Sequence, residues 1–169
     1  MKLVNIDYAD EVPNLIKQLA EPGLLLVVPD TRRKANVMAI GWATFGRVWG
    51  QPMCVVLVRP SRYTFDLLNR AGVFTVNRMP PGYEEAIERC GSISGRDVDK
   101  IAEQGWILRN CLTQPAPYIM EAALHLECRT VFTTKVTPEL DATLLAECYP
   151  RDNFHTIYFG QVTGVFRHE

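Results

Sequence analysis

Apolar residues occur in short runs along most of the chain, and the runs end at proline, glycine or asparagine. Short apolar or alternating runs of this kind are typical of β-strands. We therefore predict strands over residues 23–29, 35–45, 53–58, 73–79, 122–136 and 155–166. The run "ATLLAECYP" at 142–150 is too short for its periodicity to distinguish a strand from a helix.

Helical spacing of apolar residues is less common and is confined to three segments. Residues 6–20 and 82–91 each place apolar side chains on one stripe, and "TFDLLNRAG" begins with Thr64, a predicted N-cap, and ends with Gly72, a predicted C-cap. Because helices do not alternate regularly with strands, the pattern argues against a doubly wound parallel sheet. We predict a mainly β fold (a β-rich α+β protein), an antiparallel, Greek-key-like barrel with a few flanking helices.

Length and charge narrow the classes of function. A chain of 169 residues without an internal linker predicts a single domain over residues 1–169. The net charge of -1 argues against a nucleic acid or an anionic membrane as the main partner. The longest apolar runs are too short to span a bilayer, and the acidic N-terminal segment does not look like a signal peptide, so we expect a cytoplasmic protein.

The cysteines agree with a reducing compartment. Their number, 5, is odd, and no C-x-x-C motif is present, so buried free thiols are expected rather than disulfides. His125 and Cys128 are close in sequence, but on a strand their side chains would point to opposite faces. We therefore predict no metal site.

The stretch "VRPSRYTFDLLNRAG", residues 58–72, has the residues of an anion site. An apolar strand runs into Ser61, Arg62 and Thr64, where a helix is expected to begin. A helix N-terminus offers free N–H groups and partial positive charge, and an arginine fork can bind two phosphate oxygens. From these residues alone a second interpretation stays open, in which Thr64 only caps the helix and Arg62 is a solvated charge.

Two further stretches could contribute to a binding site. In "NVMAIGWATFG", residues 36–46, Gly41 allows a bulge or the close approach of a flat ligand, and Trp42 offers an aromatic surface beside it. In "SISGRDVDK", residues 92–100, a turn precedes Lys100, which could reach an anion. Taken singly, a core tryptophan and a solvent-facing lysine explain these residues better than a binding site does. No Gly-rich dinucleotide fingerprint, P-loop, nucleophile elbow or H-E-x-x-H motif is present.

In their order, these segments resemble the flavin reductase-like family of FMN-binding split barrels, which includes the flavoredoxins. The resemblance covers residues 22–166 and is based on "NVMAIGW", "VVLVRPSRYTFDLL", "GVFTVN", "SGRDVDK", "HLEC" and "FGQV". It implies an antiparallel split β-barrel, FMN as the cofactor and a homodimer with the flavin close to the subunit interface. The cofactor-binding residues that it implies are Asn36, Met38, Trp42, Thr44, Ser61, Arg62, Thr64 and Lys100.

The chain departs from the family near its C-terminus. Flavin reductases of this superfamily commonly carry Gly-Asp-His before the last strand, and the histidine is associated with the nicotinamide donor. This sequence has Asn153, Phe154 and His155 at those positions, so His155 remains as the candidate catalytic residue while Phe154 could close the entrance or stack on the flavin. The acid and the glycine are absent, which leaves direct oxidation of NADH or NADPH open.

Three hypotheses follow for the function. The first is a flavin reductase that uses NADH or NADPH and small-molecule flavin. The second is a flavoredoxin-like electron carrier that retains FMN and exchanges electrons with a partner redox protein. The third is a dimeric barrel whose site binds no flavin. In either redox case the flavin carries the chemistry, which agrees with the lack of a catalytic triad or paired carboxylates in the sequence.

Overall fold

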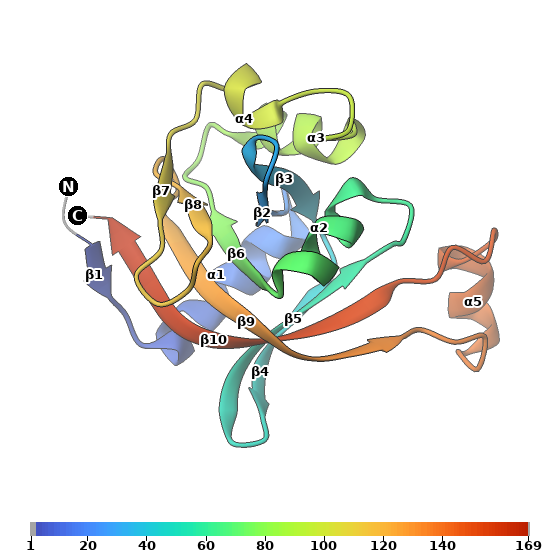
Figure 1. Cartoon of the computed structure of the whole chain (residues 1–169). Coiled ribbons are helices and arrows are strands. Elements are labelled where there is room, and N and C mark those ends of the chain that lie inside the picture. Colours follow the sequence, from blue (N-terminus) through green and yellow to red (C-terminus); the bar gives the residue numbers. More distant parts are fainter. Residues whose placement is uncertain (1–2, 169) are drawn as a thin grey trace.

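The computed structural model describes residues 3–168 and is built around one antiparallel sheet (Figure 1). The strands, in chain order, are β1 (Leu3–Asn5), β2 (Leu24–Asp30), β3 (Lys34–Ile40), β4 (Ala43–Val48), β5 (Gln51–Val58), β6 (Val73–Arg78), β9 (Leu124–Lys135) and β10 (Thr156–His168). Strands β7 (Leu108–Asn110) and β8 (Pro117–Ile119) form a separate ribbon. The mainly β, antiparallel fold class is confirmed.

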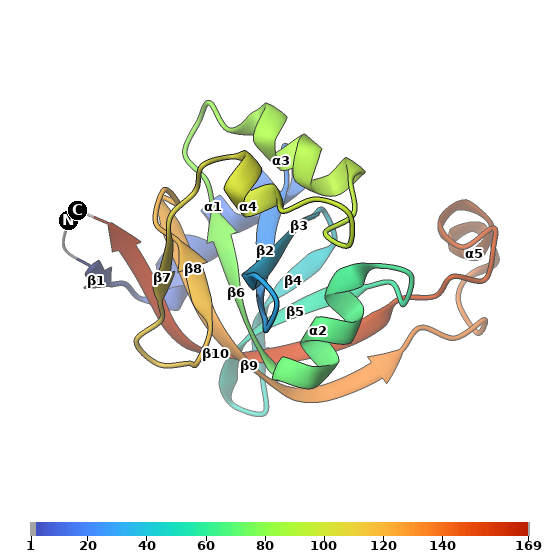
Figure 2. The ribbon, with the colours of Figure 1, turned by 45° about the horizontal axis from the view of Figure 1, so that its top comes forward.

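Five helices accompany the sheet within residues 3–168. They are α1 (Tyr8–Ala20), α2 (Tyr63–Ala71), α3 (Glu84–Ser92), α4 (Lys100–Glu103) and α5 (Ala142–Cys148). Helices α2, α3 and α4 pack on β3, and α5 lies apart from the other helices, beyond the long ends of β9 and β10 (Figures 1 and 2). No helix of the described residues is long and apolar enough to cross a membrane.

The strand order explains how the sheet curves. Its path is β3-β2-β6-β9-β10-β5-β4, with β1 added beside β10, so β3 and β4 are the two ends. These two strands follow one another in the chain with only Gly41 and Trp42 between them. The sheet must therefore curl until its ends meet, yet no ladder joins them within residues 3–168. We call this unpaired junction the seam.

The seam corrects one sequence prediction. Residues 35–45 were expected to form one strand because the apolar pattern continues across Gly41. The chain instead leaves β3 after Ile40 and enters β4 at Ala43, where it pairs with the other end of the sheet. The ambiguous segment at 142–150 contains a helix, α5, and the short elements β1, β7, β8 and α4 were not predicted.

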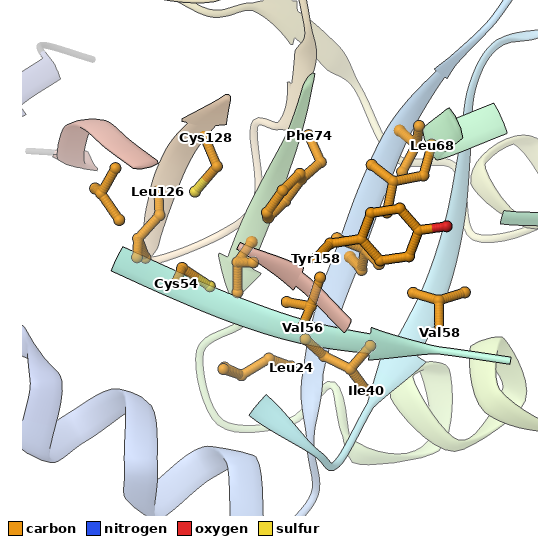
Figure 3. Close-up of a cluster of buried hydrophobic side chains, with 14 of the residues drawn as sticks. Leu24, Ile40, Cys54, Val56, Val58, Leu68, Phe74, Leu126, Cys128 and Tyr158 are labelled. Carbon is orange, nitrogen blue, oxygen red and sulfur yellow. The ribbon is translucent and has the colours of Figure 1, made fainter. Parts of the chain in front are cut away.

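Two cores share strand β2. Leu24, Leu26 and Val28 point into the barrel, where they meet residues of β5, β6, β9 and β10 (Figure 3). Leu25 and Val27 point outward into a second core under α3 and α4. Because alternate side chains of a strand face opposite sides, burial on both sides requires the continuous apolar run "LLLVV".

Gly160 of β10 lies where the barrel core is most crowded. A Cβ atom at this position would overlap the ring of Phe74 and would stand 3.0 Å from the carbonyl oxygen of Cys54. Both neighbours are fully buried, so neither can move into solvent. The close approach of three strands here therefore requires glycine.

We predict that Gly160→Ala destabilises the fold by about 1–3 kcal/mol, the usual range for overpacking a core. Gly46→Ala is the matched control, because this glycine also lies in a strand and a Cβ there would have no atom within 4 Å. Urea unfolding of the three proteins measures the free energies. Equal stability of the two variants would contradict the packing argument.

Candidate functional site

A pocket of about 80 Å³, here called the helix pocket, lies at the start of α2. Strand β3, the corner before α2 and the loop after α3 enclose it. It is lined by Asn36, Met38, Ala39, Ser61, Arg62, Tyr63, Thr64, Cys90, Gly91, Ile93, Ser94, Gly95 and Lys100. Six predicted cofactor-binding residues, Asn36, Met38, Ser61, Arg62, Thr64 and Lys100, are thereby brought together from three separate segments.

The corner before α2 leaves the helix N-terminus uncapped. The N-cap is Arg62, in extended conformation, and no side chain accepts a hydrogen bond from the first turn. The sequence prediction of Thr64 as N-cap is wrong, because Thr64 already lies within the helix. The free N–H groups and the positive end of the helix dipole thus border the pocket, an arrangement that suits an anion.

Thr64 instead connects the helix to the sheet. It is 1% exposed, and its hydroxyl oxygen accepts a hydrogen bond of 2.8 Å from Nδ2 of buried Asn36. The other end of the Asn36 amide lies against Gly95, where a Cβ atom would overlap Oδ1 of Asn36. Asn36 therefore fixes both α2 and the 94–95 loop against β3.

Lys100 forms another wall of the helix pocket and is buried rather than solvent-facing. Its Nζ donates hydrogen bonds to the carbonyl oxygens of Cys90, at 2.9 Å, and Ile93, at 3.2 Å. Burial lowers the pKa of the Lys100 ammonium. Two of its three donors thus tie the loop after α3 to α4, and one remains for a ligand.

Ser61 and Arg62 differ in the hydrogen bonds that their side chains already make within the protein. The Ser61 hydroxyl oxygen accepts a hydrogen bond of 2.8 Å from Nδ2 of Asn153. The exposed Arg62 guanidinium makes only a long contact, 3.5 Å, with the carbonyl oxygen of Gly91. Arg62 is consequently the donor that can turn towards an anion at the smallest cost.

A second pocket, of about 230 Å³, opens at the seam and is here called the seam pocket. It is lined by Met38, Ala39, Ile40, Gly41, Trp42, Leu57, Arg59, Arg62 and His155. The two pockets share Met38, Ala39 and Arg62, so they form one continuous site. Their linings include Arg59, Arg62 and Lys100 but no carboxylate, which makes the whole site electropositive.

The rings of Trp42 and His155 line the seam pocket, and Tyr149 contacts both of them. Trp42 is 44% exposed, and its ring centre lies 5.0 Å from that of His155. The Tyr149 oxygen lies 2.8 Å from Nδ1 of His155. Burial, together with the positive charges of Arg59 and Arg62, lowers the pKa of His155 to about 4. His155 is therefore uncharged at neutral pH.

Two predicted residues lie elsewhere. Thr44 is exposed on β4 and lines neither pocket, because the chain turns away into the opposite end of the sheet after Trp42. Phe154 lines neither pocket and stacks on Tyr149, with ring centres 5.0 Å apart. Whether Phe154 closes the entrance or stacks on a flavin stays a prediction.

Arg59 and Tyr149 are site residues that the sequence reasoning missed. Arg59 directly follows the strand run "CVVLV", and the sequence analysis treated it only as a link between this strand and Ser61. Its position directly after a buried strand was the available signal, since charged side chains at strand ends often face a cleft. Nothing in the sequence around Tyr149 indicated a role in the site, because its contact with His155 depends on how the segment between them folds.

One cluster outside these pockets combines possible metal ligands. Ligand atoms of Cys111, His125 and Glu127 lie within 4.8 Å of one another. The Glu127 oxygens, however, already accept hydrogen bonds from the backbone of Leu112 and Thr113, the Thr113 hydroxyl and the His125 ring. These bonds outweigh the effect of burial and lower the pKa of Glu127 to about 2. The network ties the 111–113 loop to β9.

Comparison with known proteins places this geometry in context. Residues 17–169 match the family model described as the flavin reductase like domain. The flavoredoxin from Methanosarcina acetivorans is 28% identical, with a TM-score of 0.70 over 88% of this chain and 69% of that chain. An FMN-binding protein from Thermus thermophilus, solved with bound 1-cyclohex-2-enone, is 23% identical, with a TM-score of 0.66 over 86% and 69% of the two chains.

A candidate flavin reductase with a split barrel domain, from Shewanella frigidimarina, is 14% identical. Its TM-score is 0.69, and the match covers 93% of this chain and 74% of that chain. At this identity the similarity concerns the fold alone. It confirms the split barrel that the sequence resemblance implied, and it agrees with the unpaired seam between β3 and β4.

Proposed function

The chain belongs to the flavin reductase like family, and we propose that it is an FMN-binding oxidoreductase that accepts hydride from NADH or NADPH. The observation that carries this proposal is the continuous site formed by the helix pocket and the seam pocket. One end suits a phosphate and the other a flat ring, and no carboxylate lines either part. The residues present therefore fit an anionic, ring-bearing cofactor such as FMN.

The helix pocket would hold the phosphate. The uncapped first turn of α2 supplies backbone donors, and Ser61 and Arg62 add a hydroxyl and a guanidinium. Lys100 contributes positive charge from the opposite wall. Asn36 and Thr64 act indirectly, because their hydrogen bond holds the helix start in place.

The seam pocket would hold the ring system. The last residues of β3 have no partner strand on the seam side, so their backbone groups are available to a ligand edge. Trp42 supplies an exposed aromatic surface, and His155 an uncharged hydrogen-bonding group. A bound flavin supplies hydride and electron transfer, which no side chain here can perform. The residues of the seam pocket would position the bound ring and the nicotinamide donor.

An electron carrier is the alternative function. It is favoured by the similarity to a flavoredoxin and by the replacement of Gly-Asp before His155. Asn153 is engaged with Ser61 and Phe154 with Tyr149, so neither replaces the missing acid in the seam pocket. A carrier would retain FMN and exchange electrons with a partner redox protein instead of a nicotinamide.

The thiols suggest where the protein works. All five cysteines are free, and Cys54, Cys90 and Cys128 are buried. Disulfides are rare in reducing compartments, where free buried thiols persist. We therefore propose a cytoplasmic location.

Arg62→Ala should weaken FMN binding by about ten- to hundredfold, because a charge-assisted hydrogen bond contributes about 1.5–3 kcal/mol. Riboflavin, which has no phosphate, should bind with nearly unchanged affinity. Titration of both ligands by flavin fluorescence measures the two effects. The control is Arg47→Ala, at an exposed arginine of the β4–β5 hairpin that lines neither pocket. Equal losses for the two ligands would show that Arg62 does not bind the phosphate.

Mixing the FMN-loaded protein with NADH or NADPH under anaerobic conditions should bleach the flavin absorbance. His155→Ala should slow the bleaching while FMN affinity stays nearly the same, since His155 lines the seam pocket and not the helix pocket. Stopped-flow absorbance measures the rates. No bleaching over minutes with either nucleotide, although dithionite reduces the flavin, would reject the reductase and leave the carrier. An unchanged rate in His155→Ala would remove His155 from the site.

We propose a second copy of this chain as a partner. Trp49, 63% exposed, and Phe132, 47% exposed, lie 6.0 Å apart between ring centres on one face of the sheet. Aromatic residues are enriched in interfaces. Sedimentation should give twice the 19.1 kDa of one chain, and Trp49→Asp should shift the mass towards the monomer. Ile107→Asp, at an exposed residue outside this face, is the control; a monomer at every concentration would contradict the proposal.

A further inference from the structure

We propose that Tyr149 and Arg59 are positioning residues that hold His155 as an uncharged ring with its Nε2–H directed into the seam pocket. This inference rests on the proposed function, because it assigns His155 a defined role toward the bound ring or the nicotinamide. The His155 side chain would then donate one hydrogen bond to a carbonyl-type acceptor of the ligand. It would do so without bringing a further positive charge into the site.

The first argument concerns the proton between Tyr149 and His155. A tyrosine hydroxyl has one proton to donate, and a neutral histidine has one nitrogen that accepts. The Tyr149 oxygen lies 2.8 Å from Nδ1 of His155. Burial raises the pKa of Tyr149, although the positive charge of Arg59 opposes this effect, so the hydroxyl keeps its proton. Among residues 3–168 this hydroxyl has no hydrogen-bond partner other than Nδ1 of His155, which is therefore the acceptor for its proton.

The proton on the ring must then reside on Nε2. When one ring nitrogen of a neutral histidine accepts a hydrogen bond, the other carries the hydrogen. Within residues 3–168 no hydrogen bond involves Nε2 of His155, nor is this atom among the fully buried polar atoms without a partner. His155 lines the seam pocket, so Nε2 is the nitrogen available to a ligand there.

The second argument concerns the backbone that carries both residues. The two terminal nitrogens of Arg59 donate to the carbonyl oxygens of Cys148, at 2.9 Å, and Asn153, at 2.7 Å. The guanidinium carbon lies 5.1 Å from the centre of the Tyr149 ring. Arg59 therefore fixes both ends of the segment between α5 and β10 to the end of β5. A lysine ammonium would donate from a single nitrogen and would lack the fixed separation between the two terminal nitrogens of the guanidinium.

The charged groups around His155 all oppose its protonation. Arg59 faces it from the end of β5 and Arg62 from the start of α2, while Tyr149 and Trp42 are uncharged neighbours. No carboxylate lines the seam pocket. The pKa of about 4, below the ordinary 6.5, means that lowering the pH from 8 to 5.5 leaves the ring uncharged.

Long-range ¹H–¹⁵N NMR of the full chain with ¹⁵N-labelled histidine tests the proposal directly. The chain has 3 histidines, and His155→Gln assigns the signals of His155. We expect the pattern of the Nε2–H form, unchanged between about pH 8 and 5.5, well above the pKa. The protonation form is measured on the wild-type protein, and His155→Gln serves only to assign the signals. A proton on Nδ1, or titration near pH 6.5, would overturn the proposal.

Tyr149→Phe keeps the ring and removes only the hydroxyl. We expect a mixture of both neutral forms and a rise of the His155 pKa by about one unit, the size of one neutral hydrogen bond. Tyr158→Phe is the control, because its hydroxyl donates a bond of equal length, 2.8 Å, to Asn69 outside the seam pocket. Signals of His155 that are identical in Tyr149→Phe and wild type would reject the positioning role of Tyr149.

Arg59→Lys keeps the positive charge at this position but removes the forked guanidinium that binds two carbonyl groups. We expect the lysine to leave the His155 pKa low but to broaden or divide the His155 signals, because a single nitrogen cannot hold the two carbonyl groups at the separation that the guanidinium sets. Signals as sharp as in the wild type would show that the fork of Arg59 is unnecessary. The positioning proposal and the proposed function can fail independently. If NMR shows the Nε2–H form of His155 but neither NADH nor NADPH bleaches the flavin, the positioning role stands and the reductase function is rejected.

Discussion

The site depends on one constraint, the inability of β3 and β4 to pair although they are neighbours in the chain. Within residues 3–168 every other strand of this sheet has a partner strand on each side, apart from the short β1. At the seam the sheet offers unpaired backbone groups that are partly enclosed by α2, α3 and α4. An exposed strand edge is usually a liability for aggregation, and here the same edge becomes the wall of a binding site.

The rest of the site consists of segments that are anchored to this wall. Asn36 binds Thr64 and lies against Gly95, so β3 fixes the start of α2 and the loop beyond α3. Arg59 does the same for the segment that carries His155. The anchors are hydrogen-bonded side chains with little freedom, which keeps the polar groups of the two pockets in fixed relative positions.

The sequence was sufficient for the parts of the structure that depend on local patterns. The run "LLLVV" indicated a buried strand, and Ser61 and Arg62 indicated an anion site at a helix start; the family and the fold class that followed are confirmed. The break at Gly41, the true cap at Arg62 and the pairing of Tyr149 with His155 could not be predicted. Each depends on where a distant strand or helix lies, which no local pattern encodes. The FMN role of the individual residues stays a prediction.

The segment around α5 is the least anchored part of this assembly. None of the α5 residues is buried, so the helix is held mainly at its C-terminal end, by Arg59. Segments with few apolar contacts open at a much lower free energy than the core. Binding and ordering are then coupled in both directions: a ligand that contacts His155 stabilises the segment, and whatever stabilises the segment raises the affinity for that ligand by the same factor. A surface helix that lines neither pocket can thereby tune the affinity of the site for its ligand.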